Sequence, residues 1–194
     1  MRLREVERGD SVFRRLLIRF ISAVSGMRLP DAARVAWYHS EFFGKPMGDW
    51  THATMRGDSV WTVGERELMA ALVAKWNACA FCTGAHGAIA SIEKGRSLID
   101  SALQDFRVSE LPERLKTTLV FLQKLTLRPE QVTADDARSV LRSGVSAESL
   151  MDAIAVASLF NVITRYADAL DFAMPSEREF QSAAKMLLAR GYAS

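Results

Sequence analysis

One stretch of the chain, AIAVASLFNVITRYADAL (residues 153–170), is apolar on nearly every side when it is wound as a helix. Such a helix suits a position enclosed by other parts of the protein rather than one on the surface. Elsewhere along the chain, apolar residues recur at helical spacing, whereas alternating, strand-like runs are scarce. We therefore predict an all-α protein in which this segment forms the central helix.

Glycine and proline residues fall between the periodic segments and mark where helices end. The predicted helices are residues 12–24, 32–43, 65–76, 78–93, 97–106, 112–127, 134–142, 147–170 and 177–190. Residues 45–59 hold a proline and two glycines and form the longest segment without a helical pattern, which indicates a loop over a site or a connector. No linker is long enough to separate two domains, so a single domain is predicted.

Several helix starts are signalled by side chains that can accept hydrogen bonds from the free amides of a first turn. Asp31, Thr133 and Ser146 are predicted N-caps, and Ser176 with Glu179 has the spacing of a capping box. These signals set the expected beginnings of four helices.

Charge and hydropathy exclude several kinds of partner. Twenty-five basic and twenty-three acidic residues leave a formal charge of +2, and the arginines are scattered, so nucleic acid is not an expected partner. Charged residues interrupt the first 24 residues, which argues against a secretory signal. The longest span without a formal charge, residues 76–92, is too polar to cross a bilayer. We expect a soluble, cytoplasmic protein without a membrane partner.

The two cysteines of the chain, Cys79 and Cys82, are separated by two residues, and His86 follows four positions after the second. In a reducing compartment such a pair indicates catalysis, redox exchange or half of a metal site. If Asn77 is the N-cap of the helix, Cys79 lies in the first turn. The steps of three and four residues then place both thiols and the imidazole on one helix face.

This spacing suits an activated thiol. A thiol becomes nucleophilic when it ionises, and a helix N-terminus with a neighbouring imidazole favours the thiolate. His86 can also accept the proton, and a nearby carboxylate would orient the imidazole. Glu67, on the preceding predicted helix, is the candidate carboxylate, provided that the two helices form a hairpin around Asn77.

Together these residues form the pattern Glu-x11-Cys-x2-Cys-x3-His, from Glu67 through Cys79 and Cys82 to His86. The pattern resembles the AhpD-like alkylhydroperoxidase branch of the carboxymuconolactone decarboxylase superfamily. The resemblance covers residues 59–172, which would form the AhpD-like core, with residues 1–58 as N-terminal helices and loop and residues 173–194 as a C-terminal helix of the same domain.

The resemblance implies a single-domain all-α fold in which a helical hairpin carries the Cys-x-x-Cys motif, assembled as a homo-oligomer such as a trimer or hexamer. It implies a thiol-dependent peroxidase that reduces hydroperoxides without a cofactor or metal. By this analogy Cys82 is the peroxidatic nucleophile, Cys79 is the resolving thiol, and Glu67 with His86 forms the proton relay. The reductant would be a second dithiol, which in family members can be a lipoylated carrier protein.

Two features of the motif bear on these roles. Well-studied family members have a further relay histidine immediately before the second cysteine, and here that position is Phe81. The helix N-terminus favours ionisation of Cys79, whereas His86 favours Cys82. We follow His86, because the departing alkoxide or hydroxide also needs a nearby proton source.

Other interpretations of the cysteine pair stay open at this point. The two thiols could be small buried apolar residues, or they could bind zinc with His86, although a closed site needs a fourth ligand. The chain could be a protein dithiol–disulfide oxidoreductase, or a lactone decarboxylase of the kind that names the superfamily, although that branch generally lacks the cysteine pair. It could also be a redox-sensing protein whose disulfide alters its assembly.

Overall fold

A computed structural model describes residues 1–192 and contains α-helices joined by short connections, with no β-strand among these residues. This confirms the all-α prediction. The α-helices are α1 (Arg4–Arg8), α2 (Val12–Ser25), α3 (Asp31–Tyr38), α4 (Lys45–Arg56), α5 (Val63–Trp76), α6 (Ala80–Lys94), α7 (Arg96–Asp105), α8 (Glu113–Leu127), α9 (Ala134–Arg142), α10 (Ala147–Leu170) and α11 (Glu177–Arg190). A π-helical turn, η1 (Ser40–Gly44), and a 3-10 turn, η2 (Pro129–Gln131), complete the elements.

The capping signals predict the helix starts in the C-terminal half well. The side chains of Thr133, Ser146 and Ser176 each accept a hydrogen bond from a backbone amide three residues on. Asp31 differs, because it is the first residue of α3 instead of its cap. Its buried carboxylate pairs with Arg28 at 2.7 Å and accepts a hydrogen bond from the backbone of Ala173 at 2.7 Å, so it ties α3 to the segment before α11.

The prediction for residues 45–59 is wrong, because most of this segment is the helix α4. Its proline, Pro46, lies in the first turn, where a missing amide hydrogen costs nothing. Met47, Thr51 and Met55 are buried at intervals of four residues, which is a helical stripe. The proline and Gly57 therefore mark the two ends of a helix. Residues 32–43 were also expected as one helix, but α3 ends at Tyr38 and η1 follows.

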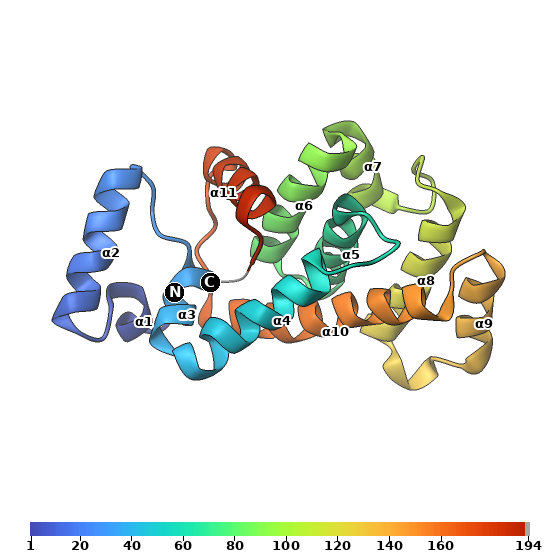
Figure 1. Cartoon of the computed structure of the whole chain (residues 1–194), viewed down its shortest axis with the longest axis horizontal. Coiled ribbons are helices and arrows are strands. Elements are labelled where there is room, and N and C mark those ends of the chain that lie inside the picture. The colour runs from blue at the N-terminus through green and yellow to red at the C-terminus, as the bar shows by residue number, and fades with distance from the viewer. Residues whose placement is uncertain (193–194) are drawn as a thin grey trace.

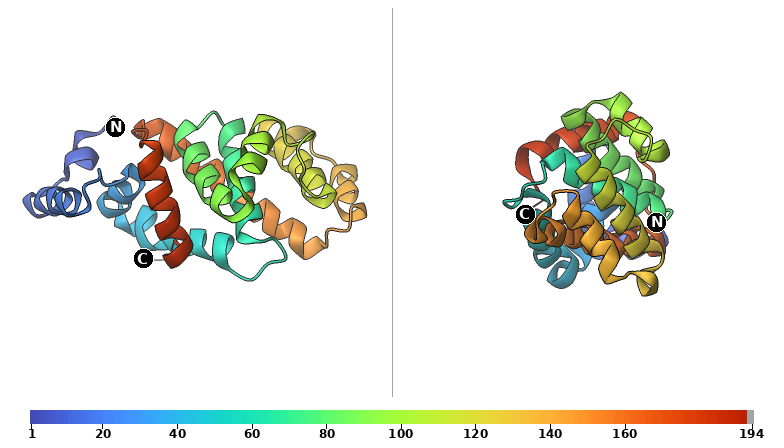
Figure 2. Two further views of the ribbon diagram at one scale, coloured as in Figure 1. Left: turned by 90° about the horizontal axis from the view of Figure 1, so that it is seen from above. Right: turned by 90° about the vertical axis from the view of Figure 1, so that its right-hand side faces the viewer.

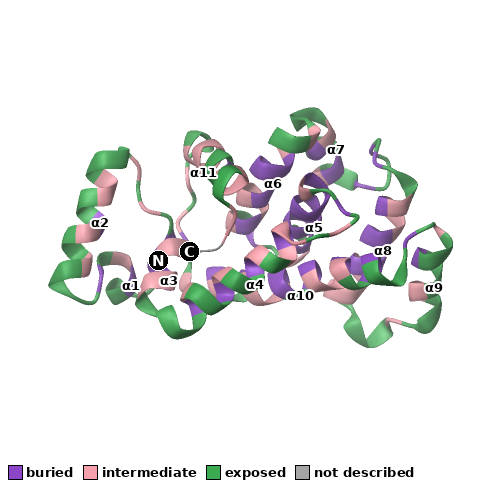
Figure 3. Cartoon of the chain, in the orientation of Figure 1, coloured by how far each residue is buried: buried purple, intermediate pink, exposed green. Residues whose placement is uncertain are grey.

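The most enclosed helix is α5, not α10. Every residue of α5 from Gly64 to Ala74 is buried, whereas α10 keeps one partly exposed side. Figure 1 shows α10 running along the molecule, with the antiparallel hairpin of α5 and α6 above it and α8 and α9 at one end. The buried residues gather on these central helices in Figure 3. Hydropathy does not indicate that α5 is central, because the helix carries charged residues. These residues are nevertheless buried, since they pair with groups from other helices.

The helix α10 is long and apolar enough to cross a membrane by length and composition. The same test is passed by core helices, and α10 contacts α4, α5, α6, α8 and α9. Its hydropathy is therefore explained by packing within the protein.

At the other end, α2 lies beside α1 and apart from the central helices (Figures 1 and 2). Its apolar side chains Phe13, Leu16 and Phe20 are 74%, 59% and 65% exposed.

The α5–α6 hairpin depends on a close approach at Gly64. A Cβ atom at this position would lie 2.8 Å from Cβ of Glu93 and 2.8 Å from Cγ of Lys94, both on α6. Gly64→Ala is therefore expected to lower the free energy of unfolding by about 1–3 kcal/mol, as overpacking does. Urea unfolding measures this change. The matched control is Gly87→Ala, where the nearest atom is the tip of Leu103 at 3.3 Å and can move; equal losses in the two variants would contradict the expectation.

Candidate active site

The turn between α5 and α6 positions the first thiol. Asn77 is the C-cap of α5 and not the N-cap of α6, which corrects the sequence prediction. Ala78 has a left-handed backbone with φ of +59°, and Cys79 takes the N-cap position of α6. The side-chain nitrogen of Asn77 donates to Asn161 at 2.9 Å and to Thr164 at 3.2 Å, so α10 holds the turn in place. The unusual backbone at Ala78 is thus fixed by contacts outside the hairpin.

The two thiols are free and buried, with Cys79 1% and Cys82 2% exposed. The pKa of Cys79 is lowered, first by the hydrogen bond from the Cys82 thiol and also by the Cys82 backbone amide, against burial and the charge of Asp168. The pKa of Cys82 is raised by its hydrogen bond to Cys79, by burial and by the charge of Cys79. Of the two thiols, Cys79 therefore ionises more readily, and Cys82 holds its proton more tightly.

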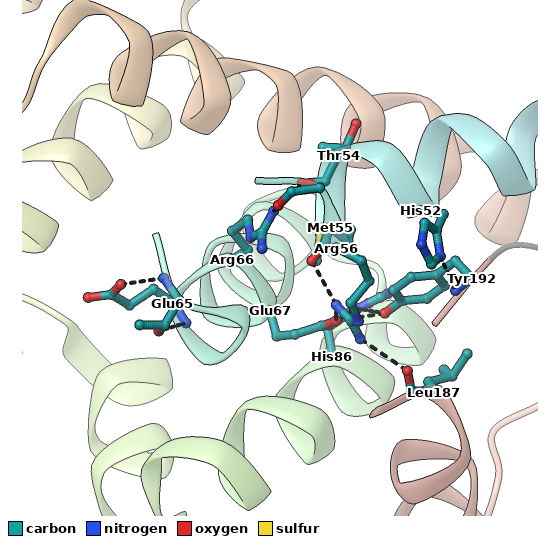
Figure 4. Close-up of polar contacts among 12 residues, drawn as sticks. His52, Thr54, Met55, Arg56, Glu65, Arg66, Glu67, His86, Leu187 and Tyr192 are labelled. Atoms are coloured by element: carbon teal, nitrogen blue, oxygen red, sulfur yellow. Dashed lines mark hydrogen bonds and ion pairs between the residues drawn. The ribbon is translucent and has the colours of Figure 1, made fainter. Parts of the chain in front are cut away.

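Glu67 lies on α5 with no exposed side-chain surface, and three other elements provide its partners. Its Oε2 is 2.6 Å from Nδ1 of His86 on α6. Its Oε1 is 2.8 Å from Nη1 of Arg56, the last residue of α4, and accepts a hydrogen bond of 2.8 Å from the hydroxyl of Tyr192, which follows α11. Figure 4 shows these side chains converging on one carboxylate.

These partners keep Glu67 ionised. Burial by itself would raise the pKa of the carboxyl. The hydrogen bond and charge of His86, followed by those of Arg56, outweigh burial and lower the pKa. The fold therefore places a buried carboxylate against Nδ1 of the imidazole, which is the arrangement that the predicted proton relay requires.

The His86 ring is held from three sides. Nδ1 faces Glu67, the ring packs edge-on against Phe160 with centroids 4.4 Å apart, and it stacks on Tyr192 at 6.2 Å. Since Nδ1 is engaged by the carboxylate, Nε2 is the ring nitrogen left to act on other groups. Cys82 lies one helical turn before His86 on α6, so the two side chains share a helix face.

Cys82 and His86 both line a large cavity of about 820 Å³. Its wall comes from α2, α3, α4, α6, α10 and α11 and is mostly apolar, with Trp37, Phe81 and Phe160 among the lining residues. Phe81, immediately before Cys82, packs edge-on against Phe172 with centroids 5.2 Å apart. A small molecule in this cavity would meet a mostly apolar surface, with Arg14, Arg28, Lys45 and Glu179 as the charged residues of the wall.

Sequence reasoning found the four residues of the motif but missed Arg56, Tyr192 and the cavity. Arg56 lies in the segment that lacked a recognised helical pattern, and Tyr192 follows the last helix. No local spacing relates either residue to Glu67, because the contacts arise from the packing of α4 and the end of α11 on the hairpin.

No protein-family model and no curated protein sequence matches this chain. Solved structures do match it in fold. A peroxidase-related protein from Silicibacter sp. TM1040 is 21% identical, with a TM-score of 0.76 over 93% of each chain. An AhpD-core, peroxidase-related protein from Ralstonia eutropha JMP134 is 24% identical, with a TM-score of 0.74 over 88% of each chain.

A third similar structure is the debrominase Bmp8, as a cysteine-to-alanine variant in complex with 2,3,4-tribromopyrrole. It is 14% identical, with a TM-score of 0.67 over 91% of this chain and 94% of that one.

The chain therefore has the all-α AhpD-like fold, as the sequence motif predicted. Within this fold, its structural neighbours include peroxidase-related proteins and a dehalogenating enzyme.

The buried charge of Glu67 makes stability depend on pH. Folding lowers the pKa of the Glu67 carboxyl, so the ionised carboxylate stabilises the fold at pH values above its ordinary pKa of 4.5. This contribution is lost as the pH falls through the pKa of the folded state. Glu67→Gln is expected to cost about 3 kcal/mol near neutral pH, because Arg56 loses its buried anion. Urea unfolding should show the difference from the wild type shrinking below a pH of 4.5.

The matched control is Glu110→Gln, at an exposed glutamate, with an expected change below about 0.5 kcal/mol at every pH. A difference between the wild type and Glu67→Gln that stays constant with pH would contradict this account of the carboxylate.

Proposed function

We propose that this protein is a thiol-dependent peroxidase that reduces organic hydroperoxides through Cys82 and Cys79. The observation that carries the proposal is that Cys82 and His86 share the wall of an apolar cavity, with the carboxylate of Glu67 bound to the far side of the imidazole. A nucleophile, a base and a group that orients the base are the parts such a reaction needs.

In the first step, Nε2 of His86 takes the proton of the Cys82 thiol, and the sulfur attacks the terminal oxygen of the hydroperoxide. The S–O bond forms as the O–O bond breaks, and the alkoxide leaves with the proton from His86. The products are an alcohol and a sulfenic acid on Cys82. Glu67 stabilises the transient imidazolium, since it accepts the Nδ1 hydrogen at 2.6 Å.

In the second step, Cys79 attacks the sulfenic sulfur of Cys82. The S–S bond forms, the S–O bond breaks, and hydroxide leaves as water after taking the Cys79 proton through His86. An external dithiol then supplies two electrons and two protons and restores the pair. The hydrogen bond between the thiols supports this order of events, because the resolving sulfur already lies against the attacking one.

Cys82, rather than Cys79, is assigned the attack on peroxide. Cys79 is the thiol with the lowered pKa, but it is not among the residues that line the cavity. Cys82 lines the cavity with His86, so a substrate reaches it first and a proton acceptor lies one turn away. Cys82 is therefore assigned the attack because the substrate can reach it and because His86 can take its proton.

The burial of both thiols also bears on the reductant. With Cys79 1% and Cys82 2% exposed, the disulfide of a folded protein substrate has little access to them. A slender dithiol arm, such as the lipoyl group of a carrier protein, could enter the cavity and reach Cys82. This argument favours peroxidase chemistry over direct protein dithiol–disulfide exchange, and a reducing cytoplasm would keep the pair ready to react.

Reductive dehalogenation is a second candidate, because the apolar cavity could hold a halogenated aromatic ring beside Cys82. In that reaction the two thiols supply two electrons, bromide leaves the ring, a proton replaces it, and the disulfide forms. The same residues would serve both reactions, so substrate tests must separate them.

The peroxidase proposal predicts a defined loss of thiols. One equivalent of cumene hydroperoxide should oxidise both thiols of the reduced chain and leave an intramolecular Cys79–Cys82 disulfide, measured by thiol counting and mass spectrometry. Cys82→Ser should show no oxidation, because the nucleophile is absent, and Cys79→Ser should stop at a sulfenic acid that dimedone traps.

Thiols that persist in millimolar peroxide would refute the proposal. Bromide release from 2,3,4-tribromopyrrole together with inert behaviour toward peroxide would favour dehalogenation. Activity that survives in a variant without either cysteine would favour a lactone decarboxylase.

The cavity predicts a preference for bulky substrates. Ala36 lines the cavity from α3, and Ala36→Phe would fill part of it. The kcat/KM for cumene hydroperoxide is expected to fall about tenfold, whereas that for hydrogen peroxide should change less than about twofold. Ala189→Phe, at an exposed position of α11 outside the cavity, is the matched control. Equal losses for both peroxides in Ala36→Phe would show that the cavity does not hold the substrate.

A further inference from the structure

The residues that follow α11 lie against the candidate active site. α11 ends at Arg190 and is capped by Gly191, whose φ of +71° disfavours other residues. A Cβ atom on Gly191 would also lie 2.5 Å from the ring of His52 on α4. The backbone nitrogen of Tyr192 then donates to Nδ1 of His52 at 3.2 Å. The glycine thus allows the chain to approach α4 and direct the Tyr192 side chain inward.

The Tyr192 hydroxyl lies between the carboxylate and the imidazole. It donates to Oε1 of Glu67 at 2.8 Å and lies 3.4 Å from Nδ1 of His86. The guanidinium of Arg56 covers the phenol ring, 4.8 Å from its centroid, and its Nη1 is 2.8 Å from the same Oε1. Figure 4 shows Tyr192 and Arg56 reaching Glu67 side by side.

The two oxygens of the Glu67 carboxylate have different partners. Oε1 is occupied by the Tyr192 hydroxyl and by Arg56, and Oε2 is left for the imidazole. With both oxygens engaged, the carboxylate cannot rotate without losing charge-assisted hydrogen bonds. Nδ1 of His86 is thereby kept as the donor, and Nε2 faces away from Glu67.

The phenol remains a donor throughout the working pH range. Burial raises its pKa well above the ordinary value, and the charge of Glu67 raises it further. The hydroxyl therefore donates its hydrogen bond to Glu67 and does not compete with the carboxylate as an anion.

We propose that Tyr192 is a positioning residue of the reaction: with Arg56 it fixes the carboxylate of Glu67, and through it the orientation and tautomer of His86. The inference rests on the proposed function for its catalytic consequence, but the orientation of His86 is testable without any substrate. It assigns a role in the site to a residue more than a hundred positions from the cysteine motif.

The test compares Tyr192→Phe, which removes one oxygen and keeps the ring, with Tyr38→Phe at an exposed tyrosine outside the cavity. Tyr192→Phe is expected to lower kcat/KM for cumene hydroperoxide about tenfold, the effect of one hydrogen bond to a charged group. Its pH profile should also change. The ionisable and charged groups that face Glu67 are Arg56, Arg66, His86 and Tyr192.

Loss of a donor to the carboxylate makes it a stronger acceptor toward the imidazole, so the acid limb of the profile should move to higher pH. Tyr38→Phe should match the wild type in both measurements. Arg56→Lys should retain more activity than Arg56→Gln, because it keeps a cation beside Glu67.

A purely structural role would predict a lower melting temperature with an unchanged pH profile, and that result would overturn the inference. So would a Tyr192→Phe variant with the kinetics of the wild type. If the wild-type chain reduces no peroxide, the proposed function fails. The ¹⁵N chemical shifts of the histidine rings, of which the chain has three, then decide the inference by themselves. A change in the ¹⁵N shifts of the His86 ring in Tyr192→Phe supports it, and unchanged shifts overturn it.

Discussion

The carboxylate of Glu67 is the group on which the rest of the site depends. An ionised carboxylate with no exposed surface is unfavourable unless it is paired and hydrogen-bonded. Its partners come from the end of α4, from α6 and from the residue after α11. The two helices that flank α5 in sequence and the distant residue Tyr192 are therefore all joined to α5 through one charge. The contacts that pair the buried charge also orient the imidazole, so the same interactions stabilise the fold and arrange the site.

The thiol pair adds a second constraint, because the two sulfurs have different surroundings. Cys79 lies at the helix N-terminus and accepts hydrogen bonds from Cys82, and Cys82 faces the cavity and precedes His86 by one turn. The helix-terminus and histidine arguments, which compete when only the sequence is considered, therefore apply to different sulfurs. The turn at Asn77 and Ala78, held by α10, keeps the two sulfurs in contact.

Much of the fold could be predicted because helical periodicity and caps are local. The bounds of α9, α10 and α11 follow from apolar spacing and from caps such as Thr133 and Ser176. The sequence does not predict α4, because Pro46 and Gly57 are typical loop residues as well as residues that start and end a helix. α5 was not recognised as the most enclosed helix, because its charged residues are neutralised by partners from other elements.

The site divides in the same way. Glu67, Cys79, Cys82 and His86 lie on two consecutive helices, and their spacing is visible in the sequence. Arg56 and Tyr192 reach Glu67 only through tertiary packing, so no sequence window contains the signal. The cavity is likewise formed by helices from both ends of the chain. The motif residues could therefore be predicted from their spacing, whereas Arg56 and Tyr192, which contact Glu67, could not.

In the proposed reaction His86, held by Glu67, moves the proton when Cys82 reacts. The most direct test is the single-turnover rate of disulfide formation after mixing with one equivalent of cumene hydroperoxide, followed by quenching and mass spectrometry. His86→Gln should be slower than the wild type by at least about a hundredfold, the usual effect of removing a general base, while His39→Gln at an exposed histidine should not. Equal rates and equal pH dependence in the wild type and His86→Gln would contradict the account.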